Sequence, residues 1–233
     1  MTADPGGLAD AARALADHLR FHQALGIREL PLTGEPLAGP TSALQRVEEA
    51  SAGCTRCKLS QGRTTIVFGS GSPEARLVII GEGPGEEEDR QGKPFVGRAG
   101  QLLTKMLASV GITREEVYIC NIVKCRPPGN RNPEPDEIAA CAPYLAGQLA
   151  AIQPGIICAL GTFAAQHLLR TREPISRLRG QLHRLGGIMV VPMFHPAFLL
   201  RNPGPEYRRQ AFDDLKLMRR EYDRIRGQAP AGA

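Results

Sequence analysis

A turn of glycines and acidic residues, GEGPGEEED at positions 81–89, could bring backbone atoms close to a flat ligand. Its glycines and Pro84 specify a rigid turn directly after the apolar run RLVII. A phosphate-binding loop would need free N–H groups and positive charge, whereas this turn carries five carboxylates. Residues 86–89 fit the first turn of a helix, where acidic side chains complement the helix dipole. Glu82 precedes that turn, so helix initiation does not account for it.

Two side chains further along the chain could recognise a planar base. Phe95 stands among polar residues next to Pro94, which suits either a core position or a plate on which a base stacks. Asn121 lies within the apolar run YICNIVKC, although Asn is depleted in strands and a buried amide must be satisfied. Asn121 therefore either holds a neighbouring loop or pairs with adjacent N–H and C=O groups of a pyrimidine ring.

The segment HPAFLLRNP begins with His195 at the end of the last apolar run. An isolated histidine is more often structural than functional, so His195 alone predicts no chemistry. Leu199 and Leu200 follow it and precede Arg201. The two leucines fit either a helical turn packed on the core or, if they are exposed, a wedge that enters a base stack.

Four of the six cysteines have a spacing that suits a metal centre. Cys54 and Cys57 form a C-x2-C pair, while Cys125 ends a predicted strand and Cys141 lies on the predicted helix after it. Four thiolates suit Zn²⁺ or an iron–sulfur cluster, although the second pair lacks the short spacing usual in zinc ribbons. The spacing leaves open a cluster, a zinc ion and no metal at all. The remaining two cysteines, which lie inside apolar runs and are expected in the core, are Cys120 and Cys158.

The elements that position these residues follow from the apolar pattern. Helical patterns alternate with four apolar runs that predict strands, at residues 76–81, 117–125, 155–161 and 187–196. Short apolar strands that alternate with helices predict an α/β fold, a three-layer α/β/α sandwich with a central four-stranded parallel sheet. Ligands bind such sheets at the carboxyl ends of the strands, and the polar clusters described above lie there.

The 233 residues are 42% apolar, enough for one sizeable domain. We expect a helical extension with a Pro/Gly-rich linker at residues 1–42, a compact domain at 43–226 and a disordered tail at 227–233. The acidic, amphipathic N-terminus is not typical of a secretory signal, and no apolar run is long enough to span a membrane. We therefore expect a cytoplasmic protein that is a monomer.

Positive charge is concentrated in one segment of a chain whose formal net charge is +5. Between residues 170 and 210 there are eight arginines and only two glutamates. Such a segment can contact nucleic-acid phosphates, although a solvated basic face is an equally simple interpretation.

Together these motifs resemble the family 4 uracil-DNA glycosylases, the iron–sulfur branch of that superfamily. The resemblance rests on GEGPGEEED…GKPFVGRAGQLL, NIVKCRPPGNRNPEPDE and HPAFLLR, in this order between residues 52 and 222. It implies excision of uracil from single- or double-stranded DNA, which leaves an abasic site, and a nucleoid-associated protein. It also implies a [4Fe–4S] cluster bound by four cysteines: Cys54, Cys57, Cys125 and Cys141.

The resemblance also implies roles for individual residues around a flipped-out uracil. Phe95 would stack on the base, Asn121 would pair with its O4/N3 edge, and Gly83 would line the pocket. His195 would donate to uracil O2 as negative charge develops on the departing base. Glu82 would orient the attacking water or stabilise a cationic sugar, ahead of two other carboxylates, Glu88 and Asp89.

One departure from the wider superfamily concerns the residue after Glu82. The best-known members carry an aspartate there, whereas this chain has Gly83, as other family 4 members do. At the duplex, Leu199 and Leu200 would act as a wedge and Arg201 would hold phosphate. The helix predicted over residues 1–30 would then be either a docking element for a replication or repair protein or a packed extension.

Three other functions compete with this interpretation. A related branch traps uracil covalently on a histidine in a basic loop, but residues 122–140 contain no histidine. A non-catalytic DNA-binding or iron–sulfur scaffold would have no need of Glu82, Phe95, Asn121 and His195 together. A zinc-containing nucleotide-binding protein would not carry an acidic loop in the phosphate position.

Overall fold

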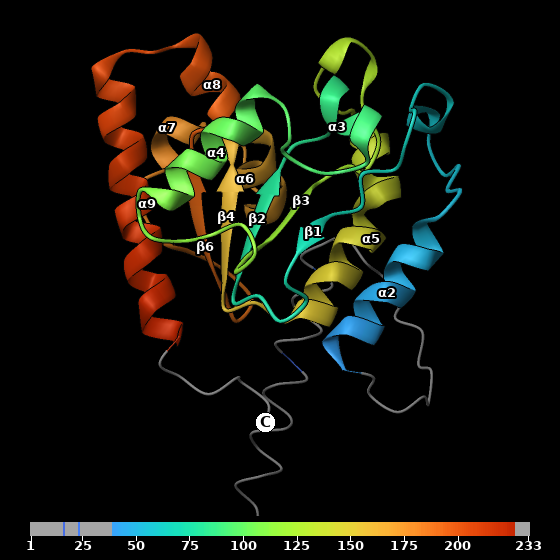
Figure 1. Cartoon of the computed structure of the whole chain (residues 1–233), viewed down its shortest axis with the longest axis horizontal. Coiled ribbons are helices and arrows are strands. Elements are labelled where there is room, and N and C mark those ends of the chain that lie inside the picture. Colours follow the sequence, from blue (N-terminus) through green and yellow to red (C-terminus); the bar gives the residue numbers. More distant parts are fainter. Residues whose placement is uncertain (1–15, 17–22, 24–38, 227–233) are drawn as a thin grey trace, which may run out of the picture.

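In the computed structural model of this chain, residues 39–226 are described, together with Ala16 and Gln23 (Figure 1). The helix expected over residues 1–30 lies outside the described residues, apart from Ala16 and Gln23, which are both helical. The expected tail at residues 227–233 also lies outside them. Among the described residues, no helix combines the length and the apolarity that crossing a membrane requires.

A six-stranded sheet with the order β1-β3-β2-β4-β6-β5 forms the centre of the molecule. The four inner strands are parallel to one another and confirm the four predicted strands: β2 (Leu77–Gly81), β3 (Tyr118–Asn121), β4 (Ile156–Leu160) and β6 (Ile188–Met193). Two antiparallel edge strands were not predicted: β1 (Ser70–Gly71) and β5 (His183–Leu185). These edge strands are too short to produce an alternating pattern in the sequence.

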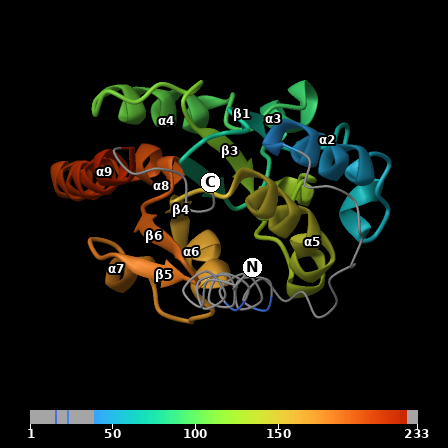
Figure 2. The same cartoon turned by 90° about the horizontal axis from the view of Figure 1, so that it is seen from below.

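Helices cover both faces of the sheet, as the three-layer prediction requires (Figure 2). The cluster on one face is packed by α2 (Pro40–Ser51), α5 (Pro135–Ile152), α6 (Gly161–Leu169) and α7 (Ile175–Leu178). The cluster on the other face is packed by α4 (Arg98–Ala108), α8 (Pro196–Arg201) and α9 (Pro205–Arg226). Three short helices lie in the connecting loops: η1 (Lys58–Gln61), α3 (Glu86–Gln91) and η2 (Pro128–Asn130).

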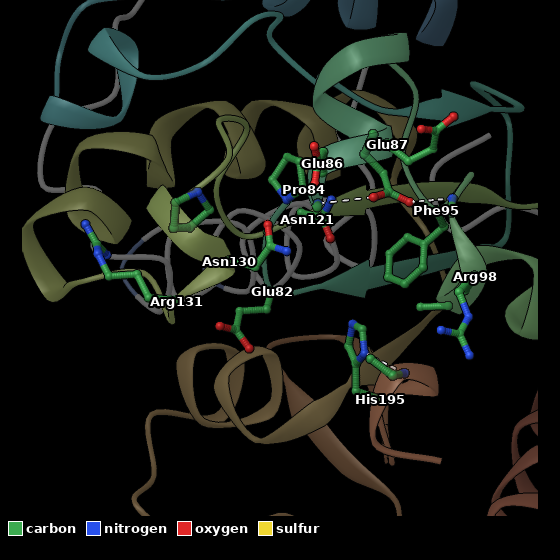
Figure 3. Close-up of a pocket in the computed structure, with 17 residues that line it drawn as sticks. Glu82, Pro84, Glu86, Glu87, Phe95, Arg98, Asn121, Asn130, Arg131 and His195 are labelled. Carbon is green, nitrogen blue, oxygen red and sulfur yellow. Dashed lines mark hydrogen bonds between the residues drawn. The ribbon is translucent and has the colours of Figure 1, made fainter. Parts of the chain in front are cut away.

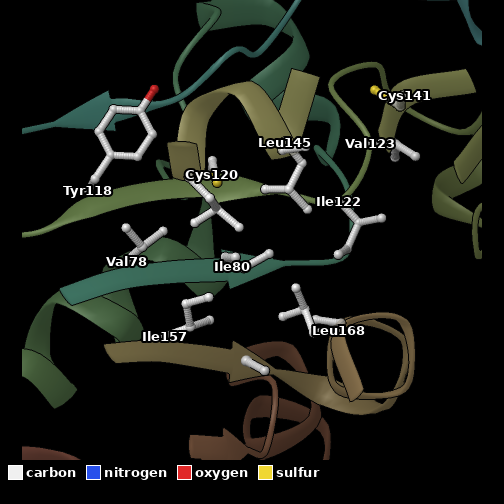
Figure 4. Packing of buried hydrophobic residues seen from close by; sticks show 14 of the residues in the cluster. Val78, Ile80, Tyr118, Cys120, Ile122, Val123, Cys141, Leu145, Ile157 and Leu168 are labelled. Atoms are coloured by element: carbon white, nitrogen blue, oxygen red, sulfur yellow. The ribbon is translucent and has the colours of Figure 1, made fainter. Parts of the chain in front are cut away.

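Alternate residues of β2 supply the two hydrophobic clusters. Val78 and Ile80 pack under α5 and α6 (Figure 4). Leu77 and Ile79 pack under α4 and α9, and all four side chains are fully buried. Because β2 is buried on both faces, it has no solvent-exposed face, and its sequence is therefore a continuous apolar run. The two cysteines expected in the core lie there: Cys120 and Cys158.

The parallel register brings the ends of the strands to one edge of the sheet. Gly81 at the end of β2 pairs with Asn121 at the end of β3, and Leu160 of β4 pairs with Met193 of β6. Glu82 follows β2 directly, and His195 follows β6 after Phe194, so side chains from distant parts of the sequence meet at this edge.

Candidate active site

A pocket of about 410 Å³ opens at the carboxyl ends of the strands, and we call it the strand-end pocket. Figure 3 shows Glu82, Phe95, Asn121 and His195 around the same space. Gly83 lines it as well, so the structure brings together all five residues that the sequence predicts for the base site. Seventeen residues form its wall: Glu82, Gly83, Pro84, Gly85, Glu86, Glu87, Glu88, Phe95, Gly97, Arg98, Ala99, Asn121, Pro127, Asn130, Arg131, His195 and Ala197.

Asn121 presents an unused acceptor to this pocket. Its side chain is only 1% exposed, and Oδ1 has no hydrogen-bond partner among the described residues. A buried polar atom in this state destabilises the free protein by about 1–3 kcal/mol, which a ligand that supplies a donor would recover. The adjacent Gly81 is required for the fit, because a Cβ there would lie 2.5 Å from both Asn121 Oδ1 and the Phe95 ring.

Phe95 belongs to the core and to the pocket at the same time, so its two sequence-based interpretations are compatible. Its ring is 6% exposed, packs in the cluster under α4 and lines the strand-end pocket. The ring centroid lies 5.6 Å from that of His195, with an interplanar angle of 33°. The backbone of Phe95 has φ 52°, a left-handed conformation that stores about 1–3 kcal/mol of strain in a bulky residue.

The imidazole of His195 is held as a neutral donor. His195 is the N-cap residue of α8, and its Nδ1 accepts a hydrogen bond from the Ala197 N–H at 3.1 Å. In the neutral ring the proton therefore resides on Nε2. Burial, assisted by the nearby Arg201 guanidinium, lowers the pKa of His195 to about 4. The ring can consequently donate from Nε2 near neutral pH without carrying charge.

Glu82 differs from the four acidic residues that follow it. Its backbone carbonyl accepts a hydrogen bond from the Val123 N–H, but its carboxylate has no hydrogen bond or salt bridge within the described residues and lines the pocket. Burial raises the pKa of Glu82 to about 7, while the Arg201 guanidinium acts in the opposite direction. A carboxylate with this pKa can exist in both protonation states near neutral pH, which suits proton transfer or the stabilisation of positive charge.

Glu88 and Asp89, the other carboxylates considered for chemistry, are occupied by backbone groups. Glu88 accepts hydrogen bonds from the Val96 and Gly97 N–H groups at 2.9 and 2.8 Å. Asp89 is 3% exposed and accepts from the Thr64 and Thr65 N–H groups at 3.0 and 3.3 Å. Both lie in α3, as do Glu86 and Glu87, which confirms that these four acids begin a helix.

The predicted wedge needs a correction. Leu199 is 8% exposed and packs among core residues of α4 and α9, so it cannot enter a base stack without leaving the core. Leu200 is 40% exposed, and Arg201 is exposed beside it. A helical turn points successive side chains in different directions, and the apolar pattern alone did not separate the two leucines.

The pocket wall also contains residues that the sequence analysis did not select. Arg98 begins α4, while Pro127, Asn130 and Arg131 come from the loop between β3 and α5. The sequence could have pointed to that loop, because its Pro, Asn and Arg residues follow a predicted strand, where pockets form in such sheets. Arg131 is committed to an ion pair with the fully buried Glu137 at 2.6 Å, whereas Arg98 is exposed.

The four cysteines selected from the sequence line a second recess, which we call the cysteine recess. Cys54 and Cys57 precede η1, Cys125 follows β3, and Cys141 lies on α5. Cys125 Sγ accepts a hydrogen bond from Arg63 at 3.3 Å, and Cys141 Sγ accepts one from the Lys124 N–H at 3.3 Å. Burial raises the pKa of Cys141 to about 11, so its thiol is protonated in the metal-free protein.

All six cysteines are free thiols. Across residues 39–226, no group of three or more His, Cys, Asp or Glu side chains has the geometry to hold a metal ion. A tetrahedral zinc ion with bonds of about 2.3 Å would need its sulfur ligands to converge on one point. A multi-iron cluster separates its ligands, since each thiolate binds a different iron.

Comparison with known proteins places this arrangement in a family. The model of the uracil DNA glycosylase superfamily matches residues 68–216. A type-4 uracil-DNA glycosylase of Thermotoga maritima is 49% identical over 74% of this chain and 91% of its own length. Type-4 enzymes of Sulfurisphaera tokodaii and Archaeoglobus fulgidus are 42% and 45% identical over 76% and 64% of this chain, and over 84% and 79% of their own. The chain therefore belongs to the uracil-DNA glycosylase superfamily and, within it, to the type-4 family.

Proposed function

We propose that the protein is a uracil-DNA glycosylase that hydrolyses the N-glycosidic bond of uracil in DNA and leaves an abasic site. The observation that carries this proposal is the unpartnered amide oxygen of Asn121, buried in a pocket that Phe95 and a neutral His195 also line. The names of the family and of its type-4 relatives support it. In the cell, the reaction would begin base excision repair.

Base recognition would use the wall of the strand-end pocket. The base must leave the duplex to reach it, and the flipped base would lie against the Phe95 ring. Asn121 Oδ1 would accept the N3–H of uracil and its amide nitrogen would donate to O4. Cytosine presents the reversed pattern at this edge, so it would leave the buried amide mispaired. Gly83 would let the backbone approach the base closely.

Bond cleavage would use His195 and Glu82. As the glycosidic bond breaks, negative charge develops on uracil O2, and the Nε2–H of His195 would donate to it. A neutral donor stabilises this charge without the penalty of a buried cation. Positive charge develops on the sugar at the same time, and ionised Glu82 would stabilise it or orient the attacking water. Glu88 and Asp89 are the weaker candidates because backbone N–H groups already occupy them.

DNA would approach over α8 and the rim of the pocket. Leu200 would fill the space that the flipped nucleotide leaves in the duplex, and Arg201 would hold phosphate. Arg98 is an exposed residue of the pocket wall and suits a second phosphate contact. Phosphate contacts of this kind position the duplex without reading its sequence.

We propose that the cysteine recess holds a [4Fe–4S] cluster rather than a zinc ion, as the resemblance to the family implies. Its four thiols line one space, and N–H groups of Arg63 and Lys124 already donate to two of the sulfurs. Hydrogen bonds and positive charge of this kind stabilise a cluster held by thiolates. When bound, the cluster would cross-link the segment before η1 to the β3–α5 region, a structural rather than a redox contribution.

The remaining proposals concern the protein in the cell. We propose that it acts as a monomer near the chromosome, with residues 43–226 as the catalytic domain. Residues 1–42 would contact a replication or repair protein. Size-exclusion chromatography with light scattering tests the first statement, and deletion of residues 1–38 followed by excision assays tests whether catalysis needs the extension.

Excision itself is tested with the purified protein and an oligonucleotide that contains one uracil, followed by alkali treatment. Strand scission at the uracil, and none in a matched oligonucleotide that contains thymine, is the expected result. Iron and sulfide are quantified on the same preparation together with its visible absorption. A cluster-containing preparation that gives no scission would refute the glycosylase proposal, and stoichiometric zinc in a colourless preparation would refute the cluster.

A further inference from the structure

The loop that presents Phe95 to the strand-end pocket holds it in a conformation that aromatic residues rarely adopt. Its φ of 52° brings Cβ close to neighbouring backbone atoms, whereas a negative φ would relieve this crowding. A change of φ at Phe95 would turn the ring away from its present place beside His195. The conformation persists only if the surrounding residues over-determine it.

Arg114 holds the carbonyl side of this loop. Its Nη1 donates to Phe95 O at 3.0 Å, and its Nη2 donates to Pro94 O at 3.0 Å. A third hydrogen bond, from Nη1 to Thr104 Oγ1 at 3.3 Å, anchors the guanidinium to α4. A planar guanidinium presents its donors in a fixed fork, so one side chain can orient two consecutive carbonyl groups.

Glu88 and α4 hold the other side of the loop. One carboxylate oxygen of Glu88 accepts both N–H groups that follow Phe95, those of Val96 and Gly97. Gly100 lets α4 pass directly against the Phe95 carbonyl, because a Cβ at that position would lie 1.9 Å from the oxygen. The two peptide groups that flank Phe95 are therefore both held. Arg114 binds the carbonyl oxygen of each, and Glu88 also accepts the Val96 N–H of the second.

We propose that Arg114 is a positioning residue for base recognition, which keeps the Phe95 ring against the flipped base by holding the Pro94 and Phe95 carbonyls. Arg114 does not line the strand-end pocket and contributes instead to a separate hollow of about 440 Å³ on another side of Phe95. Its hydrogen bonds connect it to the pocket through the loop that carries Phe95. The inference rests on the proposed glycosylase function.

The test compares Arg114→Ala with Arg219→Ala in the full-length, cluster-containing protein. Arg219 is a matched control, since its Nη1 also donates to two consecutive carbonyls, those of Val110 and Gly111 at 2.9 and 3.0 Å. We expect Arg114→Ala to lower kcat/KM for uracil excision by about 10- to 100-fold, the scale of a misplaced contact group. Inhibition by free uracil should weaken in parallel, and Arg219→Ala should change neither quantity.

A double-mutant cycle separates positioning from a general loss of stability. In a Phe95→Ala background, Arg114→Ala should cause no further loss of kcat/KM, because the ring that it positions is already absent. Arg114→Lys, which can hold one carbonyl at a time, should recover part of the activity. The same fold-loss in both backgrounds, or wild-type excision and uracil inhibition in Arg114→Ala, would overturn the proposal.

Hydrogen exchange at residues 93–97 tests, without reference to catalysis, whether Arg114 holds this loop in place. We call the two hydrogen bonds from Arg114 to the Pro94 and Phe95 carbonyls the clamp. Faster exchange of the Val96 and Gly97 amides in Arg114→Ala, with the rest of the domain unchanged, is the expected result. Unchanged exchange at these amides would overturn the clamp even if activity fell. A wild-type protein that excises no uracil would refute the proposed function instead, and the exchange measurement would still decide on the clamp.

Discussion

The strand-end pocket and the cysteine recess share one chain segment but are built in opposite ways. Residues 121–125 supply Asn121 to the pocket, and Lys124 and Cys125 to the recess. The pocket already holds a strained aromatic, an amide oxygen without a partner and a neutral imidazole. The recess instead presents free thiols. Among the described residues, no three of them have the geometry to hold a metal ion.

This difference indicates that the pocket contributes to catalysis and the recess to the stability of the fold. The unsatisfied Asn121 oxygen in the pocket reduces stability and would gain a partner from the proposed base, as expected of a preorganised site. Thiols in the recess would gain theirs from the proposed cluster, so the recess should contribute to stability. Changes in the pocket should therefore alter catalysis, and changes in the recess should alter folding.

Removal of one ligand from the recess should have the largest effect on the protein. Cys141→Ser should lose iron and lower the free energy of unfolding by several kcal/mol, because cofactor binding and folding are coupled. Cys120→Ser is the matched control, since Cys120 is buried on the same face of the sheet but does not line the recess. It should retain full iron content, and equal loss of iron in both variants would contradict the assignment.

Removal of the pocket donor should have the largest effect on catalysis. His195→Ala should lower kcat by about 10²- to 10³-fold, the magnitude observed when one donor to a developing oxyanion is deleted. His183→Ala removes a histidine on edge strand β5 that does not line the pocket, so it should leave kcat unchanged. Single-turnover excision and thermal unfolding should be measured together. A fall in kcat that merely tracks the Tm would remove His195 from the mechanism.

Exchange of the base-reading group should change selectivity with a smaller loss of rate. Asn121→Asp should raise the activation free energy of uracil excision by about 1–3 kcal/mol, because a carboxylate replaces the amide donor to O4. A carboxyl group that can accept from the cytosine amino group should at the same time admit cytosine. Excision from matched oligonucleotides that contain uracil or cytosine measures both effects. Unchanged selectivity would show that Asn121 does not read the base edge.

The dependence of kcat on pH should report the ionisation of the Glu82 carboxyl group. If the ionised carboxylate is the active form, kcat should rise about tenfold per pH unit below its pKa of about 7 and level off above it. His195, with its pKa near 4, stays neutral across this range and adds no inflection. Glu82→Gln should abolish the inflection. Arg201→Gln should move it to higher pH, because the guanidinium lowers the pKa of Glu82. A flat wild-type profile between pH 5 and 8, or an inflection that survives Glu82→Gln, would contradict this role.

Truncation of the exposed wedge should have the smallest effect. Leu200→Ala should reduce excision from double-stranded DNA by a few-fold and leave excision from single-stranded DNA almost unchanged, since a single strand needs no wedge. Leu182 is a suitable control because it is 38% exposed, close to the 40% of Leu200, and does not belong to α8. Equal effects of Leu182→Ala and Leu200→Ala would show that Leu200 does not act as a wedge.

The sequence predicted the four inner strands and their order of alternation with helices, because buried parallel strands are continuous apolar runs. It also placed His195 at a strand end and identified four cysteines that line one recess. It placed Asn121 inside a strand that ends at Cys125, whereas β3 ends at Asn121. It missed the edge strands β1 and β5, which are too short to carry a pattern. It grouped Leu199 with Leu200 because adjacent apolar residues look alike until a helix is oriented.

Residue types and local order were thus determined by the sequence alone. Glu82 stood out because it precedes the helix that explains its acidic neighbours. Only the tertiary structure decided which groups have partners: it occupied Glu88 and Asp89 with backbone N–H groups and left the Asn121 oxygen without one. It also brought Arg114 to the Phe95 carbonyl across 19 positions. Hydrogen bonding and burial depend on what the fold places within about 3 Å, and spacing along the chain does not specify that.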